Sequence, residues 1–198
     1  LQFLGDSLRA LNDAMDGRLL ITRGRPEQRI PELCAAIGAT AVHVSADFSP
    51  FGVRRDEAVS GALADAGMTW QATGSPYLIS PGRVTKDDGT PYKVFTPFFT
   101  RWKEVGWRAP AASEAIPVNW IDPASLPAAL GRTTAPDPGV EMAIEAGEPA
   151  ALRRWSQFVA EGLTHYADDR NRPDKPGTSR MSAHLKFGTI HPRTMVKD

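Results

Sequence analysis

The sequence predicts an α/β fold with a doubly wound parallel sheet, Rossmann-like but incomplete, followed by the start of an all-α domain. Two patterns support this prediction. Helical and strand periodicities alternate over the first third of the chain, which is typical of a parallel sheet with right-handed crossovers. A strongly amphipathic helical segment then begins near Pro149, after a long proline-rich stretch.

The first predicted element is a helix. Its apolar residues recur at helical spacing: Leu4, Leu8, Leu11 and Met15. The pattern stops at Gly17, and the stretch RLLIT that follows it is typical of a short buried strand. Because the strand that should precede the first helix is missing, we expect the chain to begin part-way through its α/β domain.

Two more pairs of a helix and a strand follow. Pro26 suits a first helical turn, and Gly38 ends this second helix before the strand TAVHVSA. The apolar stripe of that helix is Ile30, Leu33, Cys34 and Ile37. A third helix, roughly residues 54–66, leads through Gly67 into the strand MTWQAT.

The chain organisation follows from where these patterns stop. An aromatic-rich segment from Tyr92 to Trp107 is predicted to form a loop and a short helix whose aromatics pack against the sheet. Prolines then recur with little apolar periodicity, as in an interdomain connection. We therefore predict an α/β domain at residues 1–107, a connector at 108–148 and a helical domain beginning at 149–198. The first helix of that last segment has one apolar face: Leu152, Trp155, Phe158, Val159 and Leu163.

Composition bounds the function. Lys and Arg total 23, and so do Asp and Glu, so a nucleic-acid contact must come from a local patch. The single cysteine, Cys34, excludes a disulfide framework and a Cys-rich zinc site, and it suits a reducing cytoplasm. No stretch approaches the length of a membrane span. The four histidines are not spaced as ligands on one helical face, so we expect no metal: His43, His165, His184 and His191.

The stretch GTSRMSAHLKFG, residues 177–188, combines a glycine, hydroxyls and an arginine just before a predicted helix. Thr178 and Ser179 are expected at the helix N-cap. Two interpretations remain open: the hydroxyls simply cap the helix, or they form a phosphate cradle with Arg180 at the helix N-terminus. The spacing is not that of a P-loop, and no G-x-G-x-x-G follows a strand.

Four segments together resemble the DNA photolyase and cryptochrome family: GRLLITRGRPEQ, ATAVHVSADFSPFGVRRDEAV, GTPYKVFTPFFTRW and HYADDRNRPDKPGTSRMSAHLKFGTIHPR. The resemblance implies an α/β antenna domain joined by a long connector to a helical FAD-binding domain, with this chain truncated at both ends. It implies a carbon–carbon lyase in which a reduced flavin, excited by light, passes an electron to a cyclobutane pyrimidine dimer in damaged DNA. The fragment alone is expected to be inactive, and the full-length parent to be a cytoplasmic monomer.

The resemblance also assigns site residues. Tyr166 matches a family tyrosine near the flavin phosphates, and the family phosphate cradle T-S-x-L-S matches Thr178, Ser179, Arg180, Met181 and Ser182. Met181 stands where leucine is usual, an exchange that an apolar position tolerates. Arg170 matches an arginine close to the DNA backbone, and Arg172 adds positive charge. Alternatively, these arginines pair with carboxylates nearby: Asp168, Asp169 and Asp174. Catalytic residues are expected downstream of this chain.

Three alternatives concern the ligands and the activity. Folate-binding family members carry an asparagine and a glutamate where this chain has Asp88 and Thr90, which disfavours a folate antenna and leaves a deazaflavin, another chromophore or none. A cryptochrome-type blue-light photoreceptor would use the same FAD. Without the resemblance, a nucleotide-binding α/β protein would hold its ligand where strands end, near residues 22–24 and 45–47.

Overall fold

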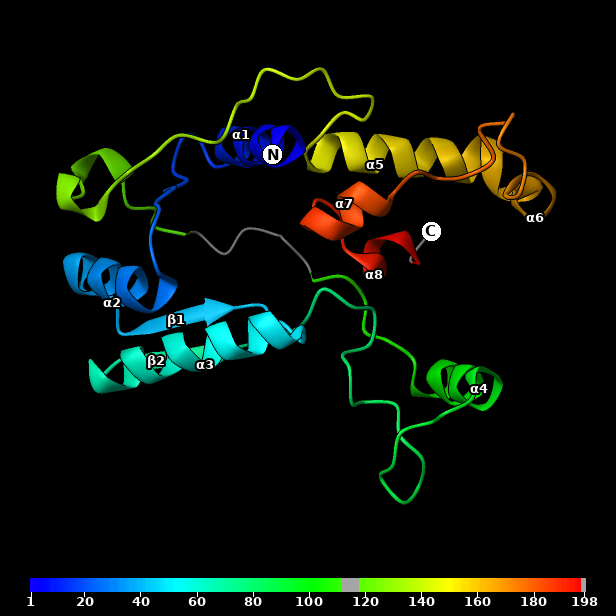
Figure 1. The fold of residues 1–198 in the computed structure, drawn as a ribbon, viewed down its shortest axis with the longest axis horizontal. Helices are drawn as coiled ribbons and strands as arrows, with labels where there is room; N and C mark the ends of the chain where they lie inside the picture. The colour runs from blue at the N-terminus through cyan, green and yellow to red at the C-terminus, as the bar shows by residue number, and fades with distance from the viewer. Residues whose placement is uncertain (112–117, 197–198) are drawn as a thin grey trace. The chain divides into compact units, whose positions relative to one another are not determined.

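A computed structural model describes residues 1–111 and 118–196 (Figure 1). Contacts divide the chain into two compact units. We call residues 20–133 the α/β unit, and residues 1–19 with 134–196 the helical unit. This grouping differs from the predicted segments 1–107, 108–148 and 149–198, because the first helix joins the helical unit and the connector is shared. The domain boundaries themselves stay a prediction.

The α/β unit contains α2 (Pro26–Ile37), β1 (Ala41–Val44), α3 (Pro50–Asp65) and β2 (Thr69–Ala72). The strands are parallel and in register from Ala41 opposite Thr69 to Val44 opposite Ala72. Cys34, Val59 and Leu63 form a buried cluster between the two helices and the sheet, and burial raises the pKa of the Cys34 thiol. The predicted second and third helices and their strands are therefore confirmed (Figure 1).

The predicted strand RLLIT, residues 18–22, is wrong as a member of the parallel sheet. In the described chain its one bridge is antiparallel and isolated, between Thr22 and Arg132, and Thr133 N donates to Ile21 O at 2.9 Å. Residues 19–22 are half-buried, and the partner of this segment comes from the connector, which the apolar run did not identify. The doubly wound sheet is accordingly seen only in part, as two parallel strands with their helices.

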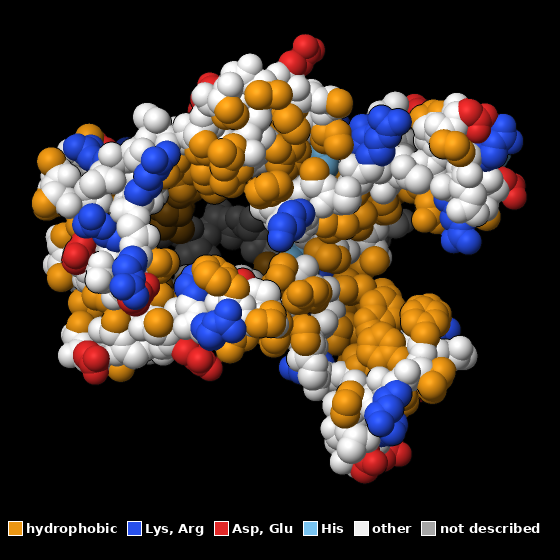
Figure 2. All heavy atoms as spheres, viewed as in Figure 1, with side chains coloured by type: hydrophobic (Ala, Val, Ile, Leu, Met, Phe, Trp, Pro, Cys, Tyr) orange, Lys and Arg blue, Asp and Glu red, His pale blue; other side chains and the backbone are white. Residues whose placement is uncertain are grey.

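The aromatic-rich segment forms α4 (Phe95–Val105), and its rings pack on one another. Among the described residues, none of these rings belongs to the buried cluster beside the sheet. The ring centroids of Phe95 and Phe99 are 5.5 Å apart, and those of Phe99 and Trp102 are 5.9 Å apart, both pairs stacked. Phe95 remains 72% exposed. Figure 2 shows hydrophobic side chains gathered over this helix. Spacing of i, i+4 and i+7 placed these rings on one face of the helix but could not identify what the face contacts.

The helical unit begins with α1 (Gln2–Ala14), which the sequence predicted as a helix of the α/β domain. Its Phe3 is buried, with ring centroids 5.3 Å from both His184 and Phe187 of α7 (Ser182–Phe187). The predicted apolar stripe is not the fully buried face: Leu11 is 47% exposed, and the buried residues of α1 are Phe3 and Gly5. Contacts such as those of Phe3 group α1 with residues 134–196.

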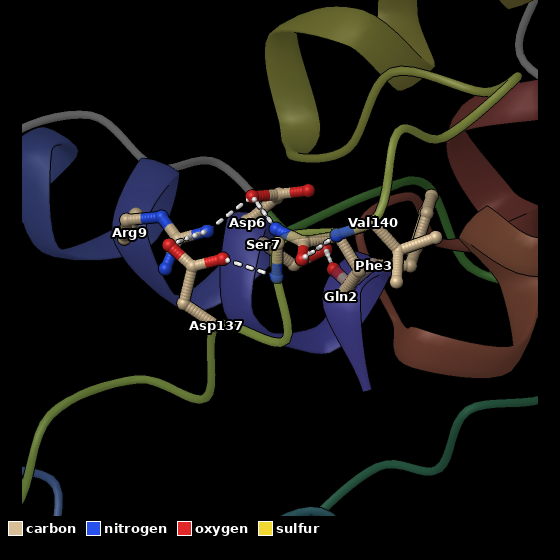
Figure 3. A network of polar contacts seen from close by, with 8 residues as sticks. Gln2, Phe3, Asp6, Ser7, Arg9, Asp137 and Val140 are labelled. Carbon is tan, nitrogen blue, oxygen red and sulfur yellow. Dashed lines mark hydrogen bonds and ion pairs between the residues drawn. The ribbon is translucent and has the colours of Figure 1, made fainter.

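The second part of the connector runs along α1. The Gln2 Oε1 accepts a hydrogen bond from Val140 N at 3.1 Å, and Arg9 pairs with both Asp6 and Asp137 (Figure 3). Gly5 is required at the closest approach, because a Cβ there would clash with the Pro136 carbonyl oxygen. The earlier part contains two 3-10 turns, Pro123–Ser125 and Ala128–Leu130, and stays with the α/β unit.

The rest of the helical unit follows α5 (Glu148–Gln157), which continues as a π-helical turn, Phe158–Gly162, and a 3-10 turn, Leu163–His165. The short helix α6 (Tyr166–Asp169) comes next, and α8 (Pro192–Met195) follows α7. Ala151, Met181 and Ile190 form the buried core with Trp155 and Met195 against them. Within residues 1–111 and 118–196, no helix is both long and apolar enough to cross a membrane.

His184 is fully buried in this unit. Its Nδ1 lies 2.8 Å from Thr189 Oγ1, while its Nε2 has no hydrogen-bond partner among the described residues. Burial lowers the pKa of His184, and the positive charge of Arg154 lowers it further. Both effects favour the neutral imidazole in the folded chain.

This arrangement predicts a pH-dependent stability. The pKa of His184 is lower folded than unfolded, so at pH values between the two the unfolded chain binds more protons. The free energy of unfolding should fall as pH falls through about 6.5, the ordinary histidine pKa, by up to about 1.4 kcal/mol per pH unit. Urea unfolding at pH 7.5, 6.5 and 5.5 measures this slope. His184→Leu should flatten it, whereas the exposed control His43→Gln should not; equal slopes in both variants would contradict the prediction.

Candidate functional site

A groove of about 360 Å³ opens in the helical unit. One wall is the carboxyl end of α5 with the π-helical turn after it, including Arg154 and Phe158. The other wall is the segment before α7, including Lys175, Ser179 and Arg180. The groove thus places cationic side chains and hydroxyls from two separate parts of the chain on one surface. Of the predicted site residues, it brings together Thr178, Ser179 and Arg180.

Thr178 and Ser179 do not cap α7, so that prediction is wrong. The helix begins at Ser182, its N-cap is Met181, and no side chain caps it. Arg180 adopts a left-handed conformation with φ 52°, which separates the two hydroxyl residues from the helix. The start of α7 is set by burial of Met181 in the core, a contact that the local sequence did not reveal. Simple capping therefore does not account for these hydroxyls.

Gly177 lets the segment approach α6 closely. A Cβ at this position would clash with the backbone carbonyl of Asp169, so the position requires glycine. The Asp169 side chain also pairs with Lys175, with Oδ1 and Nζ 2.8 Å apart. Together these contacts fasten the start of the segment to the end of α6. The glycine therefore provides room for a neighbouring backbone.

The remaining cradle residues have different surroundings. Met181 is 2% exposed and its side chain belongs to the core, so only its backbone is available to a ligand. Ser182 is exposed at the first residue of α7. Tyr166, the first residue of α6, is 39% exposed, with its ring centroid 6.0 Å from that of Phe158. The structure does not include these three residues in the lining of the groove.

The two loop arginines differ. Arg172 forms a bidentate pair with Asp174, at 2.9 Å from Nε to Oδ1 and 2.7 Å from Nη2 to Oδ2, which raises the pKa of Arg172 and lowers the pKa of Asp174. The alternative of pairing with a nearby carboxylate therefore holds for Arg172. The Arg170 guanidinium instead lies 6.0 Å from the centre of the Tyr166 ring. Its charge is presented at the surface beside a predicted site residue.

Sequence reasoning missed Arg154. Its Nε donates a hydrogen bond to the Ser179 carbonyl oxygen at 2.8 Å, across 25 residues of sequence. The helical pattern of α5 shows that residue 154 is on a polar side of the helix but not what lies opposite. Only the docking of residues 175–182 on α5 reveals the contact. Lys175 was missed for the same reason.

The alternative nucleotide site, expected near residues 22–24 and 45–47 without the family resemblance, does not form between neighbouring parallel strands. Thr22 pairs with Arg132 and not with β1, so residues 22–24 and 45–47 do not end neighbouring parallel strands. Asp47 is occupied at the start of α3: its Oδ1 accepts from Ser49 N at 2.9 Å, which lowers its pKa. Asp88, near the predicted antenna position, likewise accepts from Thr90 N and Oγ1, at 2.9 and 2.6 Å.

Over residues 1–111 and 118–196, no three histidine, cysteine or acidic side chains gather as metal ligands would. The lining of the groove combines guanidinium, ammonium and hydroxyl groups, which can bind an anion, with the carboxylates of Glu161 and Asp169.

Comparison with known proteins identifies the family. The family model described as DNA photolyase matches residues 1–118. The chain belongs to the DNA photolyase family. Among curated relatives, a deoxyribodipyrimidine photo-lyase of Synechococcus sp. (strain ATCC 27144 / PCC 6301 / SAUG 1402/1) is 32% identical over 182 residues, covering 87% of this chain and 37% of that protein. An uncharacterized 31.6 kDa protein in the atpI 5′ region of Synechococcus sp. (strain PCC 6716) is 33% identical, covering 98% and 70%.

Two solved structures of this photolyase and cryptochrome group share the fold. A class III photolyase from Agrobacterium tumefaciens has a TM-score of 0.71 at 26% identity, covering 98% of this chain and 42% of that one. A cryptochrome from Synechocystis sp. PCC6803 has a TM-score of 0.72 at 21% identity, covering 99% and 43%. The chain therefore spans about two fifths of the photolyases that it matches.

Proposed function

We propose that this chain is part of a light-driven, FAD-dependent deoxyribodipyrimidine photo-lyase that splits cyclobutane pyrimidine dimers in DNA. In this proposal residues 149–198 begin the FAD-binding domain, and the catalytic residues lie outside the chain. The observation that carries the proposal is the groove, which is lined by Thr178 and Ser179, whose hydroxyls do not cap α7, and by Arg154 of α5. Membership of the photolyase family supplies the class of cofactor.

The residues of the groove fit the diphosphate of FAD. Thr178 and Ser179 offer hydroxyl donors, and Arg180 and Arg154 offer charged donors. Ser182 and Tyr166 would extend this surface along α7 and α6. When bound, FAD supplies the light-driven electron transfer that opens the dimer. The chain's own residues bind the phosphates and orient the cofactor.

The proposal is tested on the protein expressed from the complete reading frame. Its visible spectrum after dialysis reports bound flavin, and a blue-light assay on DNA containing thymine dimers reports repair, with a dark control. Stoichiometric flavin with light-dependent repair is the expected result. Flavin without repair would favour a cryptochrome-type photoreceptor, and no flavin would contradict the proposed function.

Arg170 is predicted to contact the DNA backbone. In the same complete protein, Arg170→Ala should weaken binding to damaged and undamaged DNA by similar factors, because a phosphate contact carries no base information. The slope of log K against log salt should become shallower by about one unit. Arg172→Ala is the matched control, since Arg172 is already paired with Asp174. A loss of affinity restricted to the lesion would contradict the assignment.

A further inference from the structure

Arg154 differs from the other arginine beside it on α5. Its side chain is half-buried in the groove, where Nε donates to the Ser179 carbonyl at 2.8 Å. Arg153 points elsewhere: it pairs with Glu145 at 2.6 Å, and its side chain is 61% exposed. Neighbouring positions of one helix thus carry one arginine in a surface ion pair and one directed to the candidate phosphate segment.

The contact fixes the shape of that segment. Arg180 holds a left-handed backbone conformation that a non-glycine residue adopts only when its surroundings require it. On one side of it, the Ser179 carbonyl is bound by Arg154. On the other side, Met181 is buried against Ala151 of the same α5. Helix α5 therefore contacts the Ser179–Met181 turn on both sides of Arg180, through the hydrogen bond to Ser179 and the packing of Met181.

No carboxylate of the described residues pairs with the Arg154 guanidinium. Among the described residues it forms no ion pair, and the acidic side chains of the groove have other partners. Asp169 pairs with Lys175 at 2.8 Å, and Glu161 accepts from Gln157 Nε2 at 3.1 Å. The positive charge of Arg154 is also one cause of the lowered pKa of His184. A guanidinium has five N–H groups in a fork that matches phosphate oxygens, and Nε uses only one of them.

We propose that Arg154 is a positioning residue and phosphate ligand of the flavin site, which holds the Ser179–Arg180 turn through Nε and binds the FAD diphosphate through its Nη atoms. The assignment rests on the proposed function. It adds a ligand from α5 to a site otherwise built from the segment before α7. It also gives the half-buried guanidinium, which has no carboxylate partner among the described residues, an anionic partner.

The test compares three variants of the complete protein: Arg154→Met, Arg154→Lys and the matched control Arg153→Met. FAD and the phosphate-free riboflavin are titrated into apoprotein and followed by flavin fluorescence. Arg154→Met should lower FAD affinity by about 10- to 100-fold, the equivalent of a charged hydrogen bond, and leave riboflavin affinity unchanged. Arg154→Lys should lie between Met and wild type, because it keeps the charge without the fork. Arg153→Met should match wild type.

The outcomes separate the assignment from the proposed function. Equal FAD affinity in Arg154→Met and Arg153→Met would overturn the role of Arg154, as would equal losses for FAD and riboflavin, which indicate a purely structural effect. If Arg154→Met does not fold, Arg154→Lys decides: unchanged FAD affinity and salt dependence with lysine would overturn the need for the fork. If the wild-type protein binds FAD no more tightly than riboflavin, the phosphates contribute no affinity. That result would overturn the phosphate site itself, and the proposed function with it.

Discussion

Replacing Ser179 and Ser182 together by alanine is expected to lower the affinity of the complete protein for FAD by about 10²- to 10⁴-fold. A hydrogen bond from a hydroxyl to a charged phosphate is worth about 1.5–3 kcal/mol, and two are removed. Neither hydroxyl caps α7, so the loss should appear in binding and not in folding. Flavin absorbance per mole of protein after dialysis, with the thermal midpoint of the apoprotein, measures both.

Ser156→Ala is the matched control, because Ser156 is an exposed α5 residue outside the lining of the groove. It should retain flavin as wild type does. Unchanged flavin occupancy in the Ser179 and Ser182 double variant would show that the cradle assignment is mistaken. A fall in the thermal midpoint of several degrees without FAD would indicate that the serines support the fold instead.

The second large effect concerns the 198-residue chain by itself, which should neither retain FAD nor repair thymine dimers under blue light. Cofactor sites bury 70–90% of a ligand in a largely preformed pocket. Here the groove is about 360 Å³, and predicted ligands outside it, such as Tyr166 and Ser182, are exposed. A groove of this size, with a few hydroxyls and cationic side chains, does not offset the entropy lost when a large cofactor binds.

The measurement is direct. The purified chain is mixed with excess FAD, free cofactor is removed by gel filtration, and the visible spectrum is recorded beside a repair assay. The complete protein is the positive control. Stoichiometric flavin and light-dependent repair by residues 1–198 would show that the groove is a sufficient site.

Much of the secondary structure could be predicted from local pattern. The helix from Pro26 to Ile37 is set by a proline in its first turn and a left-handed Gly38 at its end, and both signals lie within the segment. The strands at Ala41–Val44 and Thr69–Ala72 follow in the same way from short apolar runs after glycines. The resemblance to the photolyase family, which the family match and the curated relatives confirm, also needed only the order of residues.

The tertiary structure decided what each pattern contacts. The apolar periodicity of α1 fits a helix in either unit, and Phe3, which lies outside the predicted stripe, is the residue that contacts His184 and Phe187 of the helical unit. RLLIT is extended in both interpretations, but its partner is the connector at Arg132. Hydrophobic burial is not directional, so a sequence pattern fixes the need for a partner without choosing one.

In the candidate site, too, the sequence determined the chemical groups and the tertiary structure determined their arrangement. The sequence alone determined which residues carry hydroxyls and charge, from Thr178 to Ser182, because those groups are properties of the side chains. Their arrangement was decided by packing. Because Met181 is buried in the core, α7 starts after it, and Thr178 and Ser179 lie before the helix without capping it. Arg154 reaches Ser179 across 25 residues, and a contact at that separation exists only once both elements are folded against the same core.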